Sequence, residues 1–474
     1  MGASLHEALC LVKADKHQYP AVDLHYSQSD PLATPVVVTL PENGLRLRFD
    51  GADQRLRLIE VLGFKKAKLV YKGSELVKTP SDGPIAASGP AFRRIYQLFG
   101  ASYPGEYLPP KDSAAGTYVL SWPGVAFTFP LQHSAWSAEK DHVAMLGSHA
   151  ASAATHMAVF EGRSWPEARR DLFVKTPSGP RLSPLATRPK DSLPSEVEVL
   201  HVHGDGRVDI FRRGPAQPVC ITLNETTPQD LITELGPPDV MYRREERAVA
   251  SDQNARKRTG STSRPLSNGR HTGSQPSSYS STGTDTFDTD FDSGETDEDP
   301  AERAGREKFW CYFSHGMDIL VGPPSDDASI GVDENARTPL SASPHLVVTK
   351  VIIHGNVPGS YAFNRHRRLQ WSLDLDTDQL LTSEHNFEAR IKPSLLATFA
   401  DTWPVSEMSA GKVVNRTWGA DPSESSFFLP DAGEDLVEGG NGSEQWLGNT
   451  RLYAFPGLTF EVLENGAVSA LTAS

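Results

Sequence analysis

Residues 124–129 read Gly-Val-Ala-Phe-Thr-Phe, a glycine followed by apolar residues at the first, third and fifth positions after it. The same phrase starts at Gly44, Gly316 and Gly457. Apolar alternation with period two after a turn residue is typical of a strand that buries one face. Four occurrences of this phrase indicate that a structural unit has been duplicated.

Each phrase has a helical pattern upstream of it. Apolar residues three or four positions apart occur within 5–12, 92–99, 231–235 and 395–399, and a proline or glycine follows each stretch. Further strand patterns follow at 56–62, 347–353 and 467–471, the last after the turn signal Asn465-Gly466. The sequence therefore predicts an α+β fold of repeated helix-plus-antiparallel-hairpin (α-β-β-β) modules, forming sheets with helices on one face.

The repeat pattern divides the chain into three regions. We expect the first two modules in residues 1–150, a bridging β-hairpin region in 151–220, and the last two modules in 221–474. Residues 248–306 are rich in Ser, Thr, Gly and Asp and poor in large apolar side chains, so they are predicted to be a disordered insertion. This insertion is either a solvated loop or a phosphorylated regulatory segment. A shorter loop is predicted at 323–344.

Composition restricts the classes of function. The formal net charge of -14 argues against nucleic-acid binding, which requires cationic side chains to neutralise phosphates. The three cysteines are far apart, a pattern typical of a reducing compartment. The sequence has neither an apolar run long enough to span a membrane nor a signal-peptide core. We therefore expect a cytoplasmic protein without a transmembrane segment.

Motifs for enzyme chemistry are lacking in the sequence. It contains no phosphate-binding GxxxxGK[ST] loop, no GxGxxG after a strand and no GxSxG elbow. His201 and His203 would share one face of a strand, but no third metal ligand is close to them in the sequence. His315 and His354 are a conceivable acid/base pair without an evident carboxylate partner. We therefore expect no catalytic residue, no cofactor and no metal site.

The most basic stretch outside the predicted insertion is Asn364-Arg365-His366-Arg367-Arg368-Leu369-Gln370-Trp371. Its cations suit either an anionic lipid surface or the protection of an edge strand. Together with the Asn, Pro and Gly residues before it, this stretch is a candidate partner- or membrane-facing segment. Its candidate residues are Asn356, Pro358, Gly359, Tyr361, Asn364, Arg365, Arg367 and Arg368.

Four segments resemble the phagosome assembly factor 1 family, and the resemblance extends from about Leu5 to the C-terminus. They are residues 97–107 (QLFGASYPGEY), 122–129 (WPGVAFTF), 312–320 (YFSHGMDIL) and 354–364 (HGNVPGSYAFN). The chain departs from the family pattern at Arg367-Arg368, where relatives have a His-Arg pair before an aromatic residue.

The resemblance implies a non-enzymatic regulator of autophagy. Such a protein would act at the phagophore assembly site with a WD-repeat β-propeller partner, where membranes carry phosphoinositides. A Golgi or vesicle trafficking factor is the alternative. An enzyme would instead require a pocket in which distant His, Asp, Glu or Cys side chains meet.

Overall fold

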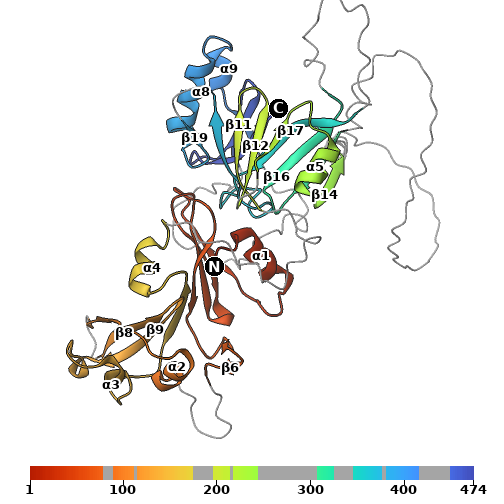
Figure 1. The fold of residues 1–474 in the computed structure, drawn as a ribbon. Helices are drawn as coiled ribbons and strands as arrows, with labels where there is room; N and C mark the ends of the chain where they lie inside the picture. Colours follow the sequence, from red (N-terminus) through yellow and green to blue (C-terminus); the bar gives the residue numbers. More distant parts are fainter. Residues whose placement is uncertain are drawn as a thin grey trace, which may run out of the picture.

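The structure is a computed structural model that describes residues 1–77, 89–110, 115–174, 196–213, 217–243, 307–324, 345–375, 380–415 and 449–474. These residues form two lobes (Figure 1), an N-terminal lobe up to residue 174 and a C-terminal lobe from residue 196 onward. The predicted insertion at 248–306 lies outside the described residues, as does the predicted loop from residue 325 onward.

One eight-stranded antiparallel sheet forms the centre of the N-terminal lobe, with the strand order β1-β2-β3-β4-β10-β9-β8-β7. It combines two units, each with a helix before four sheet strands, and the second unit has a further short helix between its third and fourth strands. The first unit contains α1 (Leu5–Ala14), β1 (Asp23–His25), β2 (Val36–Leu40), η1 (Pro41–Asn43), β3 (Leu45–Phe49) and β4 (Leu56–Val61). The second contains α2 (Phe92–Phe99), β7 (Glu106–Leu108), β8 (Ala115–Trp122), β9 (Val125–Gln132), η2 (His133–Ala135), α3 (His142–Leu146) and β10 (His156–Phe160).

The C-terminal lobe repeats this plan in a second eight-stranded sheet, ordered β14-β15-β16-β17-β23-β22-β21-β20. Its first unit contains α5 (Pro228–Leu235), β14 (Val240–Arg243), β15 (Lys308–Tyr312), β16 (Met317–Gly322) and β17 (Val347–His354). Its second contains η5 (Phe387–Ile391), α8 (Lys392–Phe399), α9 (Val405–Ser409), β20 (Lys412–Asn415), β21 (Asn449–Phe455), β22 (Leu458–Val462) and β23 (Val468–Ala473).

The four phrase glycines occupy the same place in the four units. Gly44, Gly124, Gly316 and Gly457 have φ angles of +64°, +82°, +83° and +69°, a region that favours glycine, and each precedes the third strand of its unit. The α+β class and the antiparallel sheets are confirmed. Each unit has one strand more than the predicted module, namely its first strand (β1, β7, β14 or β20), which lies at a sheet edge. The fourth strands of neighbouring units pair with each other: β4 with β10, and β17 with β23. The second unit therefore runs beyond residue 150.

The helices of the N-terminal units cover one face of their sheet. Leu5, Leu9 and Val12 of α1 pack on β2, β3 and β4, while Phe92 and Ile95 of α2 pack on β8 and β9. The helix α4 (Trp165–Asp171) lies on the other face against Ala126, which alternation places opposite to Phe127. A hairpin of β5 (Val70–Tyr71) and β6 (Ser74–Glu75) forms a separate small sheet.

A third large sheet covers the C-terminal eight-stranded sheet. It contains β11 (Val197–His203), β12 (Arg207–Arg212), β13 (Val219–Thr222), β18 (Gln370–Asp374) and β19 (Leu381–Thr382), in the order β13-β12-β11-β18-β19. The strands β11 and β18 are parallel. Both sheets, α5 and α8 share one hydrophobic core around Trp371, Phe387 and Phe460. The capping box of Thr227 and Asp230 starts α5, and Gly236 ends it with a positive φ.

Candidate functional site

The two lobes meet at residues 355–369, here called the junction segment, which connects β17 to β18. Asn356 and Asn364 have φ angles of +44° and +60°, a conformation that asparagine tolerates better than most residues. Asn356 makes two hydrogen bonds with the side chain of Gln54 in the N-terminal lobe: its Nδ2 donates to Gln54 Oε1 at 2.8 Å, and Gln54 Nε2 donates to the main-chain carbonyl of Asn356 at 2.7 Å. This buried amide pair fixes the register between the lobes.

Apolar contacts at the junction accompany the amide pair. Leu32 of the N-terminal lobe packs with Val357 of the junction segment and Ala467 of the C-terminal lobe. In the opposite direction, Phe363 of the junction segment packs against the core beneath α1. Each lobe therefore contributes apolar side chains to a cluster of the other, and the junction segment belongs to both.

Four arginines and four carboxylates surround the junction: Arg55, Arg57, Arg367, Arg368, Asp50, Asp53, Glu196 and Glu384. Arg55 Nη1 lies 2.9 Å from Glu196 Oε1, and Arg367 contacts the same carboxylate. Arg368 donates to the Ala52 carbonyl in the other lobe and, at 2.8 Å, to Glu384. Burial, together with the nearby Arg55, lowers the pKa of Arg367 to about 9.

These contacts change the interpretation of the basic stretch. Asn356, Pro358, Asn364, Arg367 and Arg368 are buried. The expected exposure of these five residues is thus corrected, because their side chains pack between the lobes. The protection of an edge strand is also wrong, since the arginines precede β18, and β18 lies between β11 and β19 within its sheet.

The other three candidate residues are half-buried at the rim of the junction. The Arg365 guanidinium lies over the Tyr361 ring, 4.6 Å from its centroid. Gly359 has a φ of +86°, and a Cβ atom there would approach the Tyr26 hydroxyl of the N-terminal lobe to 3.1 Å. The rim therefore continues the contact between the lobes.

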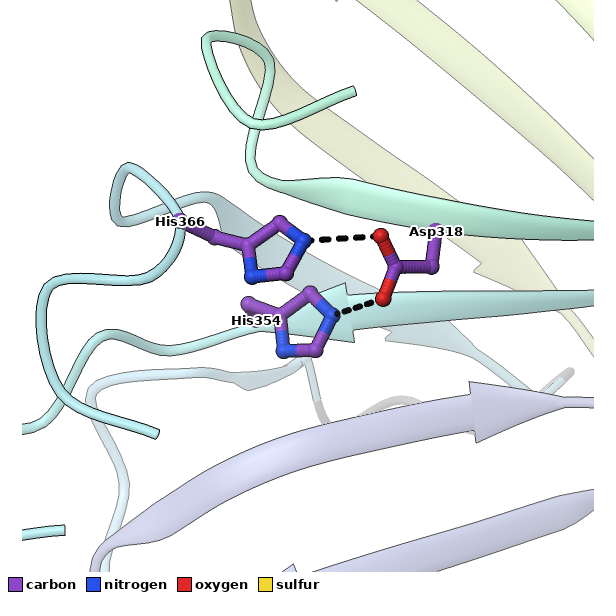
Figure 2. Close-up of side chains that lie close together, drawn as sticks. All are labelled: Asp318, His354 and His366. Carbon is purple, nitrogen blue, oxygen red and sulfur yellow. Dashed lines mark hydrogen bonds and ion pairs between the residues drawn. The ribbon is translucent and has the colours of Figure 1, made fainter. Parts of the chain in front are cut away.

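A cluster of two histidines and one aspartate lies beside the junction (Figure 2), and we call it the histidine cluster. His366 Nε2 lies 2.7 Å from Asp318 Oδ1, and His354 Nε2 lies 3.1 Å from Asp318 Oδ2. The imidazole rings are stacked, with centroids 3.8 Å apart and an interplanar angle of 12°. Asp318 and His354 come from the adjacent strands β16 and β17, and His366 comes from the junction segment.

Burial and hydrogen bonding set the protonation of the histidine cluster. Burial acts to raise the pKa of Asp318, but the hydrogen bonds from His354 and His366 outweigh it and hold that pKa well below its ordinary value. Burial and the neighbouring His354 lower the pKa of His366 to about 4, although Asp318 opposes this shift. At neutral pH, the carboxylate is ionised and accepts hydrogen bonds from a neutral His366 and from His354.

The ring geometry fits hydrogen bonding better than metal coordination. A metal bound by histidine lies about 2.0–2.1 Å from the nitrogen, along the lone pair in the plane of the ring. Stacked, nearly parallel rings direct their Nε2 lone pairs side by side, so one ion could not lie in both planes. The side chains as placed therefore form a hydrogen-bonded unit around Asp318.

The histidines singled out in the sequence have separate environments. His354 has the carboxylate partner that the sequence did not reveal, whereas His315 is buried and its Nδ1 has no hydrogen-bond partner. His203 lies between two carboxylates: its Nε2 is 3.0 Å from Asp209 Oδ2, and its Nδ1 is 3.4 Å from Asp374 Oδ2. His201 packs on Phe211, with the ring centroids 4.3 Å apart. Strand β11, which carries His201 and His203, is flanked by β12 and β18 and so is not a sheet edge.

Strand alternation contains a signal for the Asp318–His354 pair. Asp318 pairs with Ile352 across β16 and β17, so His354, two residues later, projects from the same face as Asp318. His366 carries no such signal, because it reaches the pair from a loop. A surface cavity of about 400 Å³ lies elsewhere, between β13 and α5, and it is lined by Cys220, Thr226 and Asp230 among others rather than by the histidine cluster.

The fold and the junction define a class: a two-lobed α+β protein built from repeated helix-plus-strand units. A family model described as phagosome assembly factor 1 matches residues 1–265 and 294–473. The chain therefore belongs to the phagosome assembly factor 1 family, which supports a role in phagosome assembly.

Three relatives of the chain come from eukaryotes that are only distantly related to one another. A PHAF1 protein of Arabidopsis thaliana is 22% identical over 477 residues, which cover 100% of this chain and 89% of the relative. A PHAF1 protein of Drosophila melanogaster is 22% identical over 490 residues, with the same coverage of 100% and 89%. A PHAF1 protein of Caenorhabditis elegans is 30% identical over 130 residues, 27% of this chain and 28% of the relative. No solved structure gives a significant match.

Among the described residues, none of the helices combines the length and the apolar character needed to cross a membrane.

Proposed function

We propose that this chain is a non-enzymatic adaptor in autophagy that acts in the cytoplasm and is recruited to the phagophore assembly site. The observation that carries the proposal is the family match, which covers both lobes. We further propose a WD-repeat β-propeller protein as its partner and a peripheral association with phosphoinositide membranes. These two expectations come from the family resemblance of the sequence.

The arrangement of polar side chains supports an adaptor over an enzyme. Three side chains of catalytic types do meet in the histidine cluster, which is what an enzyme would require. However, Asp318 accepts hydrogen bonds from both imidazoles, and His366 is buried within the junction segment. Among the described residues, the lining of the cavity beside β13 does not include the cluster, and the hydrogen bonds of the cluster involve no nucleophilic side chain. We therefore assign the cluster to structure rather than to substrate chemistry.

Open sheet edges offer surfaces for an adaptor. The outermost strands of the two eight-stranded sheets are β1 and β7 in one lobe, and β14 and β20 in the other. Exposed apolar side chains lie on three of them: Leu108 on β7, Met241 and Tyr242 on β14, and Val413 on β20. A partner can add a strand to such an edge or cover its apolar side chains.

The test is purification of the tagged full-length chain from cells under native conditions, followed by mass spectrometry and crosslinking of the recovered complex. We expect a WD-repeat β-propeller protein in stoichiometric amount, with crosslinks to the described lobes. In parallel, the purified chain is floated with vesicles containing a phosphoinositide and with matched vesicles containing phosphatidylserine. Recovery without a β-propeller protein contradicts the partner, and equal flotation with both vesicles contradicts phosphoinositide recognition.

Microscopy of the tagged chain in starved cells tests the site of action. We expect it to colocalise with markers of the phagophore. Colocalisation with Golgi markers alone would favour the alternative of a trafficking factor.

A further inference from the structure

The histidine cluster connects the eight-stranded sheet of the C-terminal lobe to the junction segment, which contacts the N-terminal lobe. Asp318 and His354 belong to β16 and β17, whereas His366 belongs to the junction segment. Two residues before His366, the Asn364 carbonyl lies 3.2 Å from Nδ1 of His6, a residue of α1 in the N-terminal lobe. The hydrogen bond between His366 and Asp318 therefore holds in place the same segment that contacts α1.

The surroundings of His366 disfavour a positive charge. The Phe313 ring packs edge-on against the imidazole, with centroids 4.9 Å apart, and the His354 ring stacks on it at 3.8 Å. Asp318 is the carboxylate that faces it, and His6 is the ionisable group that approaches from the N-terminal lobe. The second ring nitrogen, Nδ1 of His366, is buried without a hydrogen-bond partner. A proton added there would have no acceptor.

His6 is under the same constraint on the other side of the junction. Burial lowers its pKa, and the nearby Arg367 acts in the same direction. Hydrogen bonding to Asn364 and the charge of Asp239 oppose this shift. Acidification would therefore place positive charge on His6 at one side of the junction and on His366 at the other. Asp318 already accepts hydrogen bonds from two imidazoles.

We propose that the histidine cluster makes the docking of the two lobes dependent on pH: the neutral cluster holds the junction segment in place, and protonation of His366 favours its release. His366 can couple the two lobes because it contacts Asp318 of β16 and His354 of β17, while the backbone two residues before it contacts His6 of α1.

The sign of the pH dependence follows from linkage. The pKa of His366 is about 4 in the docked state, compared with an ordinary value of 6.5 once the imidazole is exposed. The released state binds more protons between these two values, so docking is fully favoured above pH 6.5 and weakens as the pH falls towards 4. Between pH 7.5 and pH 5, complete exposure of His366 on release would lower the docking equilibrium constant roughly 30-fold.

The distance between the lobes measures this equilibrium in the full-length chain. Spin labels are attached to Cys220, which is exposed on β13, and to a cysteine introduced by Tyr103→Cys, where the native side chain is 90% exposed. Cys10→Ser removes the other exposed thiol, and Cys311 is buried. Double electron–electron resonance at pH 7.5 should give one dominant distance, and at pH 5 a second, longer distance should appear.

Variants separate the cluster from general acid effects. His366→Gln retains a donor for Asp318 but cannot become charged, so its distance distribution should change much less between pH 7.5 and pH 5. His149→Gln, which removes an exposed histidine of the N-terminal lobe, should keep the wild-type response. If His366→Gln does not fold, His366→Asn takes its place, because its side-chain amide likewise cannot become charged.

Three results would overturn the proposal. The first is an unchanged distance distribution of the wild-type chain between pH 7.5 and pH 5. The second is the same pH response in the wild type and in the folded cluster variant, which would assign the transition to other groups. Far-UV circular dichroism at both pH values identifies global unfolding, and a distance change that occurs only together with unfolding would also count against the proposal.

Discussion

At the scale of single residues, the four phrase glycines differ in what surrounds them. All four have positive φ angles, so any side chain there strains the backbone. Gly316 has an additional constraint, because a Cβ atom would lie 2.4 Å from the Arg367 carbonyl oxygen of the junction segment. At Gly457, the nearest atom to such a Cβ is 3.6 Å away. Gly316 therefore has two roles, as the turn residue of its unit and as a close contact of the junction segment.

This difference predicts unequal costs for one chemical change. Gly457→Ala should cost about 1–2 kcal/mol of stability from the backbone conformation alone. Gly316→Ala should cost about 1–3 kcal/mol more, because the junction segment must shift to relieve the contact. Scanning calorimetry of both variants tests this expectation. Equal melting temperatures would show that Gly316 does not support the junction segment.

At the scale of elements, the junction depends on ions that are largely withdrawn from water. Glu196 contacts both Arg55 and Arg367, whose side chains are 11% and 5% exposed. Such a network contributes little net stability when complete, but it is costly when one member is lost, because an unpaired buried charge remains. The carboxylate is therefore more important for the junction than a surface ion pair would be.

Glu196→Ala should lower stability by about 2 kcal/mol, a value reduced from that of fully buried pairs because Glu196 is itself partly exposed. Glu60→Ala is the matched control, since it removes a carboxylate that two more exposed arginines, Arg46 and Arg48, share on the N-terminal sheet. That change should cost less than about 1 kcal/mol. Comparable losses in thermal unfolding experiments would contradict the role of Glu196.

The connection between β14 and β15 is a second feature at this scale. Arg243, the last residue of β14, pairs with Lys308, the first residue of β15, so the two strand ends that the connection joins already lie side by side. The family model passes over residues 266–293, which lie within the predicted insertion. We therefore expect deletion of residues 266–293 to change the melting temperature by no more than a few degrees, since long loops add little to the cost of closure. A much larger decrease would show that the insertion contributes to folding.

At the scale of the whole molecule, the sequence predicted the repeat better than the arrangement of the lobes. Alternation after Gly44, Gly124, Gly316 and Gly457 depends on local packing, so the strands could be located without the structure. The pairing of β4 with β10 and of β17 with β23 could not, because it joins strands of different units. The sequence also did not reveal that β18 joins β11 in a parallel pair.

The junction was misjudged for a related physical reason. Asn, Pro, Gly and Arg are usual in exposed loops, and composition alone gives no sign that a second lobe covers them. The partners of Asn356 and Arg368 are Gln54 and the Ala52 carbonyl, about 300 positions earlier in the chain. Polar residues at a contact between lobes have the same local pattern as polar residues in water, so only the tertiary structure separates the two.

Hydrogen exchange of the full-length chain at pH 7.5 tests the central claim most directly, namely that residues 355–369 are the buried contact between two repeated lobes. We predict that peptides from this segment exchange as slowly as those from the adjacent strand β17, and that Glu196→Ala accelerates exchange in the segment and in residues 50–57 together. Exchange of the segment within seconds in the wild-type chain, as in an exposed loop, would contradict the account.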